Sequence, residues 1–174
     1  IIQDVPVQDL KRVESQSGLM LATAAQNRVI FFGVNTAKGP TANLKVRQAM
    51  NIAINRDAIK KIVMRNQSDP TGVIMPPFVN GWNETLNKYP ANDLKAAKAL
   101  MAEAGYADGF DIVLNCPNDR YINDAKIAEA LAQMLTRVGI DASVETMTKA
   151  VYFSRASTGG PDKSPEFSFM VLGW

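Results

Sequence analysis

The chain has 174 residues, of which 47% are hydrophobic and 21% charged, with a formal net charge of +2 at pH 7. This is the size and composition of one ordinary globular domain, and its scattered Lys and Arg residues argue against a nucleic-acid partner. The chain has no histidine and one cysteine, which excludes histidine-based catalytic triads, zinc sites and internal disulfides.

The two ends of the chain suggest how it relates to a larger protein. No apolar run reaches the ~20 residues of a membrane span, and the first residues lack the basic and apolar regions of a signal peptide. The sequence begins without methionine and ends in the apolar run "EFSFMVLGW". An edge strand left open there would be a liability, so we expect a piece of a longer protein.

The first half of the sequence predicts short elements separated by polar loops. In chain order we expect strands at residues 1–2, 19–25 and 28–35, a short helix at 7–16, and helices at 44–54 and after Asn55. Asn43 is a candidate N-cap for the helix at 44–54, and Ile59, Ile62 and Val63 are predicted to face inward in the next one. Residues 66–90 carry four prolines and no period, which is typical of a functional loop or an extended arm.

The second half predicts an α/β layer. Asn92 is expected to cap a helix that ends at Gly105, and a strand follows over Phe110–Cys116. Asn123 or Asp124 is expected to cap the next helix, which ends at Gly139. Further along, we expect a strand at 140–147, a helix near 149–156, a loop at 157–166 and a strand at 167–172.

Two features with a chemical appearance are interpreted as structural. The glycine-rich "STGGPD" lacks the Gly-Lys-Ser/Thr ending of a phosphate loop and is predicted to be a flexible hairpin connection. Cys116 lies at a strand end and is expected to be a half-buried small residue rather than a nucleophile. No catalytic residue, metal site or cofactor is predicted.

Five segments in order resemble one family. They are "NLKVRQAMNIAINRDAIKKIV", "GVIMPPFVNGW", "YPANDLKAAKALMAEAGYADGF", "PNDRYINDAKIAEALAQMLTRVGI" and "FSFMVLGW". The chain from about Arg28 to Trp174 thus resembles the periplasmic substrate-binding proteins of dipeptide, oligopeptide and nickel ABC transporters, the bacterial extracellular solute-binding proteins of family 5.

The resemblance implies an architecture and a set of partners. The chain would be a single α/β lobe over residues 1–174, a mixed sheet flanked by helices, with 1–27 near the connection to a missing second lobe. A peptide or peptide-like ligand would bind in the cleft between the lobes and pass to a membrane permease. The resemblance also implies a periplasmic or exported location.

The resemblance also indicates candidate ligand-binding residues. In dipeptide-type members an arginine in the loop after the strand matching Phe110–Cys116 pairs with a ligand carboxylate, and Arg120 occupies a similar place. A guanidinium can hold a carboxylate with two hydrogen bonds beside a helix N-terminus. The alternative is a solvated turn arginine, or one paired with Asp119 or Asp124.

Three aromatic and polar residues complete the candidate site. Family members often carry a Gly-Trp pair at the matching strand end, so Trp174 would line the ligand site, although such a residue can equally pack in a core or rim. Tyr121 and Asn118 would add hydrogen bonds, or serve only the turn. The competing hypothesis is a small α/β enzyme or regulatory domain that uses the Asn115–Arg120 turn to recognise anions.

Overall fold

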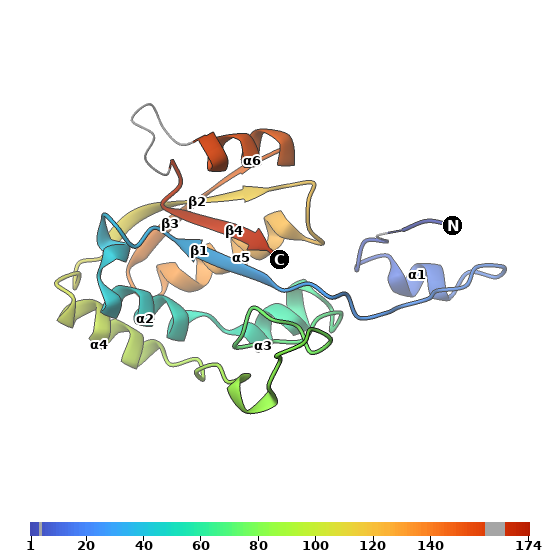
Figure 1. Ribbon diagram of the computed structural model, residues 1–174, viewed down its shortest axis with the longest axis horizontal. Coiled ribbons are helices and arrows are strands. Elements are labelled where there is room, and N and C mark those ends of the chain that lie inside the picture. Colours follow the sequence, from blue (N-terminus) through green and yellow to red (C-terminus); the bar gives the residue numbers. More distant parts are fainter. Residues whose placement is uncertain (4, 159–165) are drawn as a thin grey trace.

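The computed structural model describes residues 1–3, 5–158 and 166–174, and its central element is a four-stranded mixed sheet (Figure 1). The strands are β1 (Ile30–Val34), β2 (Phe110–Pro117), β3 (Ile140–Met147) and β4 (Phe169–Gly173), in the spatial order β1-β4-β2-β3. β2 pairs in parallel with both β3 and β4, whereas β1 pairs antiparallel with β4. The prediction of an α/β fold with a mixed sheet is confirmed.

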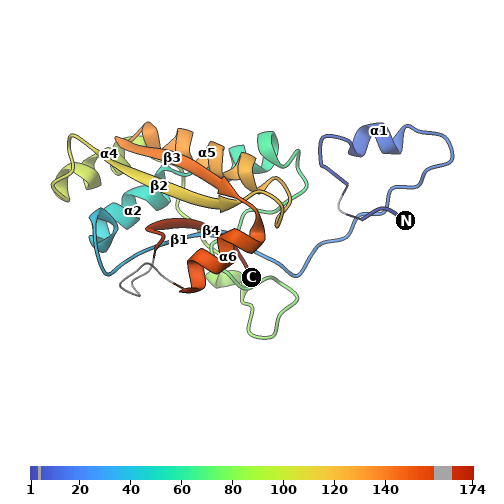
Figure 2. The same cartoon turned by 90° about the horizontal axis from the view of Figure 1, so that it is seen from above.

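Helices cover both faces of this sheet. The larger layer contains α2 (Leu44–Ala53), α4 (Leu94–Glu103) and α5 (Asp124–Thr136), and α6 (Lys149–Thr158) lies on the opposite face (Figure 2). α5 connects β2 to β3, and α6 follows β3 on the way back to β4. Because the two connections use opposite faces, β2 is covered by helices on both sides, as is usual for parallel strands.

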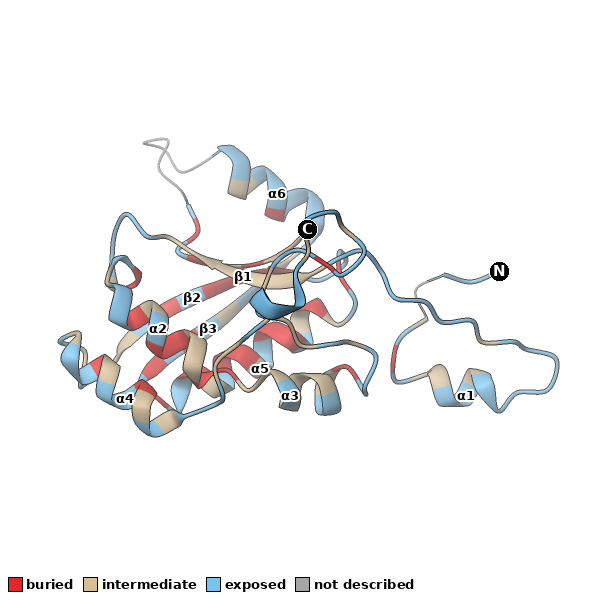
Figure 3. Ribbon diagram, turned by 60° about the horizontal axis from the view of Figure 1, so that its bottom comes forward, coloured by how far each residue is buried: buried red, intermediate tan, exposed pale blue. Residues whose placement is uncertain are grey.

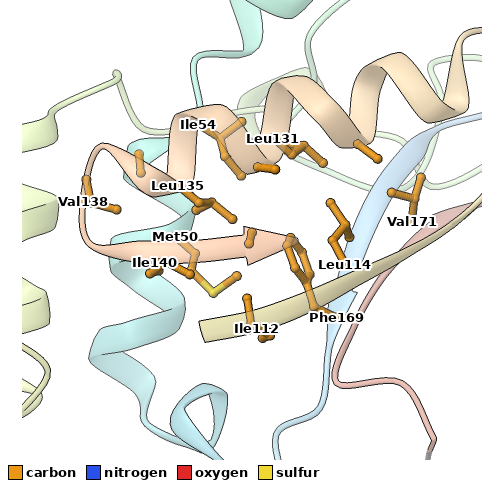
Figure 4. Packing of buried hydrophobic residues seen from close by; sticks show 14 of the residues in the cluster. Met50, Ile54, Ile112, Leu114, Leu131, Leu135, Val138, Ile140, Phe169 and Val171 are labelled. Atoms are coloured by element: carbon orange, nitrogen blue, oxygen red, sulfur yellow. The ribbon is translucent and has the colours of Figure 1, made fainter. Parts of the chain in front are cut away.

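The hydrophobic core lies between the sheet and the layer of α2, α4 and α5 (Figure 4). Met50 of α2, Leu131 and Leu135 of α5, Leu114 of β2 and Phe169 of β4 are all buried there. The alternate residues of β2 and the apolar stripe of α5 face this core, as their periods predict. α6 contributes one buried side chain, Tyr152, on the other face.

Side-chain caps define several helix ends, partly as predicted. The Asn43 side chain accepts a hydrogen bond from the Lys45 amide at the start of α2. Asp93, not Asn92, caps α4 by accepting from the Ala96 amide. The Asn92 amide group instead donates to the carbonyl oxygens of Ile52 and Ala53, which satisfies the C-terminal end of α2.

The helix predicted after Asn55 is a compound element. Asn55 caps α3 (Arg56–Ala58), which continues as one π-helical stretch, η2 (Ile59–Val63). Ile62 is 76% exposed, so the prediction that it faces inward is wrong. The wider π turn shifts the side chains relative to an α-helical stripe, and only Ile59 and Val63 pack against the core.

The described residues up to about 27 form an arm that extends from the body of the chain (Figure 3). It contains α1 (Leu10–Glu14), which confirms the predicted helix, but α1 buries no residue. The strands predicted at 1–2 and 19–25 are wrong, because these residues join no sheet in the described structure. A strand requires a hydrogen-bonding partner, which local β propensity does not supply.

Two remaining predictions concern the connections. Residues 66–90 consist of turns and irregular segments, and their one regular element is the short 3-10 helix η3 (Glu84–Leu86). A second 3-10 helix, η1 (Pro40–Ala42), precedes α2. Most of the loop predicted at 157–166, including its glycine pair, lies outside the described residues.

Candidate functional site

Four chain segments meet at one edge of the sheet, the one formed by the carboxyl ends of its parallel strands. The parallel strands β2, β3 and β4 end there, and the antiparallel strand β1 begins there, with Ile30 opposite Gly173. Arg28, the turn of residues 118–121 and Trp174 therefore lie around the same edge. In open α/β sheets ligands bind at the carboxyl ends of the strands, beside a point where the connections change direction. β2 is such a point, since its neighbours β3 and β4 are reached over opposite faces (Figure 1).

The turn after β2 is held on both sides by backbone hydrogen bonds and two aspartates. The Asn118 amide donates to the Met147 carbonyl oxygen at 2.9 Å, and Asp119 Oδ1 accepts from the Lys149 amide at 2.5 Å at the start of α6. On the other side, Asp124 Oδ2 accepts from the amides of Arg120 and Tyr121, both at 3.0 Å. These contacts fix the backbone that carries Arg120.

Asp124 was a candidate cap for α5, but its side chain instead holds the turn that precedes this helix. Its side chain is nearly buried, and its second oxygen, Oδ1, accepts from the Ala125 amide at 2.9 Å. Asn123 is the first flanking residue of α5, but it has a left-handed φ of 56° and makes no side-chain cap. Its amide group donates to the Val63 carbonyl oxygen at 2.9 Å, which connects the turn to η2. Asp124 thus stabilises the turn by accepting hydrogen bonds from its backbone amides, and Asn123 links the turn to η2.

Tyr121 is the centre of the site. It is buried, and its ring packs on the backbone of Gly173 in β4: a Cβ placed at position 173 would lie 2.5 Å from Tyr121 Cε1. The Arg120 guanidinium carbon lies 5.2 Å from the ring centre, and that of Arg28 lies 6.0 Å away. The ring thus joins β4, the turn after β2 and the residue before β1.

Arg120 is exposed and has no anionic partner among the described residues. The alternatives in which it pairs with Asp119 or Asp124 are not realised, because those carboxylates accept backbone hydrogen bonds instead. Its guanidinium lies over the ring of Tyr121. A guanidinium oriented by an aromatic ring and without a carboxylate partner is suited to bind an anion.

Trp174 projects outward from the same edge. The residue is 83% exposed, so it does not pack in the core of the described chain. Its backbone is fixed by two hydrogen bonds with Val29, 2.9 and 3.0 Å long, which extend the pairing of β1 with β4. Asn118 is exposed at the turn and makes no side-chain hydrogen bond within the described residues. The structure therefore brings Asn118, Arg120, Tyr121 and Trp174 to one place.

The structure adds two residues that sequence reasoning missed. Arg28 was treated only as the start of a strand, and Gly173 only as part of a motif. The contact of Arg28 with Tyr121 depends on the pairing of β1 with β4, whose members are separated by more than a hundred residues. The glycine near the end of the predicted last strand was a usable signal for Gly173, since glycine in a strand often marks a place where another group approaches the backbone closely.

A polar network lies behind the site, between the sheet and α6. The Asn115 amide group donates to Glu145 at 2.8 Å, and Arg155 bridges Glu145 and Glu166 at 2.9 and 2.6 Å. The hydrogen bond from Arg155 is the main cause that lowers the pKa of Glu145. A cavity of about 350 Å³ opens beside Asn115 and Glu166 on this face. The network fastens α6 to the sheet.

The single cysteine of the chain, Cys116, lacks the exposure of a reactive thiol. Cys116 is fully buried rather than half-buried, because its side chain points into the core, and burial raises the pKa of its thiol to about 12. A thiol with that pKa stays protonated at neutral pH. Within the described part of the chain, no group of three or more Cys, Asp or Glu residues is placed to hold a metal ion. None of the described helices has the length and apolarity needed to cross a bilayer.

Comparison with known proteins gives a consistent result. The family described as bacterial extracellular solute-binding proteins, family 5 Middle, matches residues 1–174. The Dipeptide-binding protein of Escherichia coli K12 is 31% identical over 169 residues, covering 95% of this chain and 30% of that protein. Heme-binding protein A of Haemophilus influenzae is 29% identical over 174 residues, covering 97% and 30%. The chain thus spans about 30% of the length of these relatives.

Solved structures share the fold. The periplasmic binding protein DppA of Helicobacter pylori, solved with the peptide STSA, superposes with a TM-score of 0.78 at 25% identity, covering 97% of this chain and 31% of that one. The oligopeptide-binding protein AppA of Bacillus subtilis, solved with a nonapeptide, gives a TM-score of 0.83 at 22% identity, covering 98% and 35%. Because AppA is only 22% identical to this chain, its similarity concerns the fold alone.

Proposed function

The chain belongs to the bacterial extracellular solute-binding proteins of family 5, and from this premise we propose that it is one lobe of a binding protein for a peptide or peptide-like solute. The ligand would lie in the cleft between this lobe and a second one. The bound solute would then be delivered to the permease of an ABC transporter. Residues 1–27 would lie near the connection between the lobes, and the protein would work in the periplasm or outside the cell.

The observation that carries the proposal is the placement of Arg120. Its guanidinium is exposed at the carboxyl ends of the parallel strands, rests on Tyr121, and lacks an anionic partner among the described residues. The backbone behind it is held by Asp119 and Asp124, so little ordering is needed when a ligand binds. Arg120 would hold the ligand's terminal carboxylate with two hydrogen bonds.

The other three residues would shape the rest of the pocket. Trp174 offers a large exposed ring at the same end of the sheet, suited to cover apolar parts of a peptide. Asn118 would hydrogen-bond polar groups of the ligand. Tyr121, whose ring is buried, would act mainly by holding the arginine, with its hydroxyl as a further hydrogen-bonding group. No step of bond making or breaking is assigned to any of them, so we propose a binding role rather than an enzymatic one.

The test uses the protein at its full natural length and a panel of free peptides of two to five residues. Calorimetry identifies the peptide that binds wild type with the lowest Kd. Arg120→Ala should weaken its binding by about thirtyfold or more, which corresponds to the ~2 kcal/mol or greater cost of leaving a desolvated carboxylate unpaired. Arg120→Lys should restore part of the affinity, since an ammonium keeps the charge but not the planar fork.

Two controls separate ligand contact from a general effect. The same peptide with a C-terminal amide should bind wild type poorly and respond little to Arg120→Ala. Arg137→Ala, an exposed arginine just after the far end of α5, should leave binding unchanged. If Arg120→Ala binds the free-acid peptide as tightly as wild type, Arg120 is only a solvated turn residue and the proposed site is wrong.

A further inference from the structure

Two arginines from distant parts of the sequence share the ring of Tyr121. Arg120 follows β2 and Arg28 precedes β1, and their guanidinium carbons lie 5.2 and 6.0 Å from the ring centre. Both arginines are exposed. The pairing of Val29 with Trp174 fixes the backbone next to Arg28, so its position at this edge is set by the sheet.

Neither guanidinium is neutralised within the described part of the chain. The described ion pairs include neither Arg28 nor Arg120. The two carboxylates on the adjoining turn, Asp119 and Asp124, are occupied by backbone amides. Lys149, at the start of α6, adds a further exposed cation to this edge. Arg28, Arg120 and Lys149 thus face the two carboxylates of the turn, which keep their charge while they accept backbone hydrogen bonds, so the cations outnumber the anions by one. Both guanidiniums remain without an ion-pair partner among the described residues.

We propose that Arg28 is a second anion-binding residue and that, with Arg120, it selects ligands carrying two carboxylates, such as peptides with an acidic side chain next to the C-terminus or on it. This inference rests on the proposed function and specifies its ligand class. Arg120 takes one carboxylate and Arg28 the other. The ring of Tyr121 holds both guanidiniums in place before the ligand arrives, which lowers the ordering cost of binding.

A ligand with a single carboxylate, the alternative class, could pair with only one of the two arginines. It would leave one of two neighbouring cations uncompensated in a closed, poorly hydrated cleft, where like charges repel more strongly than in water. A second carboxylate removes that repulsion and adds charge-assisted hydrogen bonds. We therefore expect a preference of roughly tenfold or more for the doubly anionic ligand, the usual effect of one hydrogen bond to a charged group.

The experiment compares matched peptides on the full-length protein. Di-, tri- and tetrapeptides of alanine ending in Glu or in Gln differ by one carboxylate and hardly at all in shape, and their Kd values are measured by calorimetry at low and at physiological salt. Wild type should prefer the Glu peptide of a pair about tenfold or more. Arg28→Gln should reduce that preference to less than about threefold without weakening the Gln peptide, and Arg28→Lys should keep most of it. Arg137→Gln is the matched control and should keep all of it.

Each outcome of these titrations either supports or overturns the proposed role of Arg28. A preference for Glu peptides that depends on Arg28 supports the inference, as does its decline with added salt. Equal binding of the Glu and Gln peptides by wild type, or a Glu preference that persists in Arg28→Gln, overturns the inference and leaves the peptide-binding proposal standing. Failure of every peptide to bind, in a protein that unfolds cooperatively, overturns the proposed peptide function and the ligand class together.

Discussion

The ring of Tyr121 lies directly on the backbone of Gly173, so that a Cβ at position 173 would be 2.5 Å from Tyr121 Cε1 and 2.7 Å from Ile30 Cδ1. This contact connects the turn that carries Arg120 with the strand that ends in Trp174. Glycine at position 173 is therefore required for the two halves of the candidate site to meet. The same ring then supports the guanidiniums of Arg28 and Arg120.

The first prediction is that Gly173→Ala lowers both stability and binding. The added methyl group must displace the ring of Tyr121 in a packed environment, which typically costs about 1–3 kcal/mol of unfolding free energy. Chemical denaturation of the full-length protein measures that cost. The displaced ring would also move Arg120, so the Kd for the free-acid peptide should rise.

Gly33→Ala is the matched control for this contact. A Cβ there would meet Leu172 Cδ1 at 3.3 Å, the end of a flexible side chain that can move aside. We expect a smaller loss of stability and no change in Kd. A Gly173→Ala protein with wild-type stability and affinity would show that the ring of Tyr121 does not rest on the strand as described.

The second prediction concerns Asp124, which holds the turn. Asp124→Ala leaves the amides of Arg120, Tyr121 and Ala125 without their acceptor, and a buried unsatisfied donor costs ~1–3 kcal/mol. We expect a loss of about 2 kcal/mol or more in unfolding free energy and weaker peptide binding. Asp124→Asn keeps one acceptor oxygen and should lose less.

Glu129→Ala, an exposed carboxylate on the same helix, is the control and should change stability by less than about 0.5 kcal/mol. Hydrogen exchange provides a second readout, because the amides of Arg120 and Tyr121 should lose protection in Asp124→Ala. Unchanged protection of those two amides would contradict the assignment of Asp124 as their acceptor.

The third prediction is a loss of stability at alkaline pH. Burial raises the pKa of Cys116 from 9.0 to about 12 and raises the pKa of Tyr152 above its ordinary value of 10.0. For acids whose pKa is higher in the folded state, the stabilisation is complete below the unfolded pKa and declines as pH rises toward the folded pKa. The unfolding free energy should therefore fall above pH 9, by at most about 1.4 kcal/mol per pH unit for each group.

Two substitutions isolate the groups responsible. Cys116→Ala should flatten the decline that begins near pH 9, and Tyr152→Phe the part that begins near pH 10. Because Tyr152→Phe also removes the 2.6 Å hydrogen bond to the Val171 carbonyl oxygen, its overall stability will be lower, and only the slope against pH is compared. A double variant with the wild-type slope would rule out both groups as the source.

The fourth prediction is that Cys116 resists alkylation in the native protein. Its sulfur is fully buried and donates to the Pro117 carbonyl oxygen at 3.0 Å, and its raised pKa leaves little thiolate at pH 8. Iodoacetamide should label the native protein at pH 8 far more slowly than the protein in concentrated urea, as followed by mass spectrometry. Equal labelling rates in the two conditions would place the thiol at the surface.

The sequence was sufficient where structure depends on neighbouring residues. The cap at Asn43, the alternation in β3 and the left-handed glycines at 105 and 139 are local patterns, and each predicted its element. The helix after Asp93 was also predicted, although its cap was placed one residue too early, at Asn92. Five segments in order also indicated the family before any fold was known. The candidate residue Arg120 was also named from the sequence, because it lies in a polar turn between a strand and a helix and matches an arginine of the family it resembles.

Only the tertiary structure decided what surrounds Arg120. The partner of Tyr121 is Gly173, and its second arginine is Arg28; both come from strands that local periodicity cannot pair, since β1 and β4 meet through long-range hydrogen bonds. Two sequence predictions were wrong because they relied on local patterns. Residues 19–25 have strand propensity but no partner strand in the described chain, and Ile62 turns outward because η2 adopts a π-helical rather than an α-helical turn. Propensity and period act within a few residues, whereas the site is built from segments that only folding brings together.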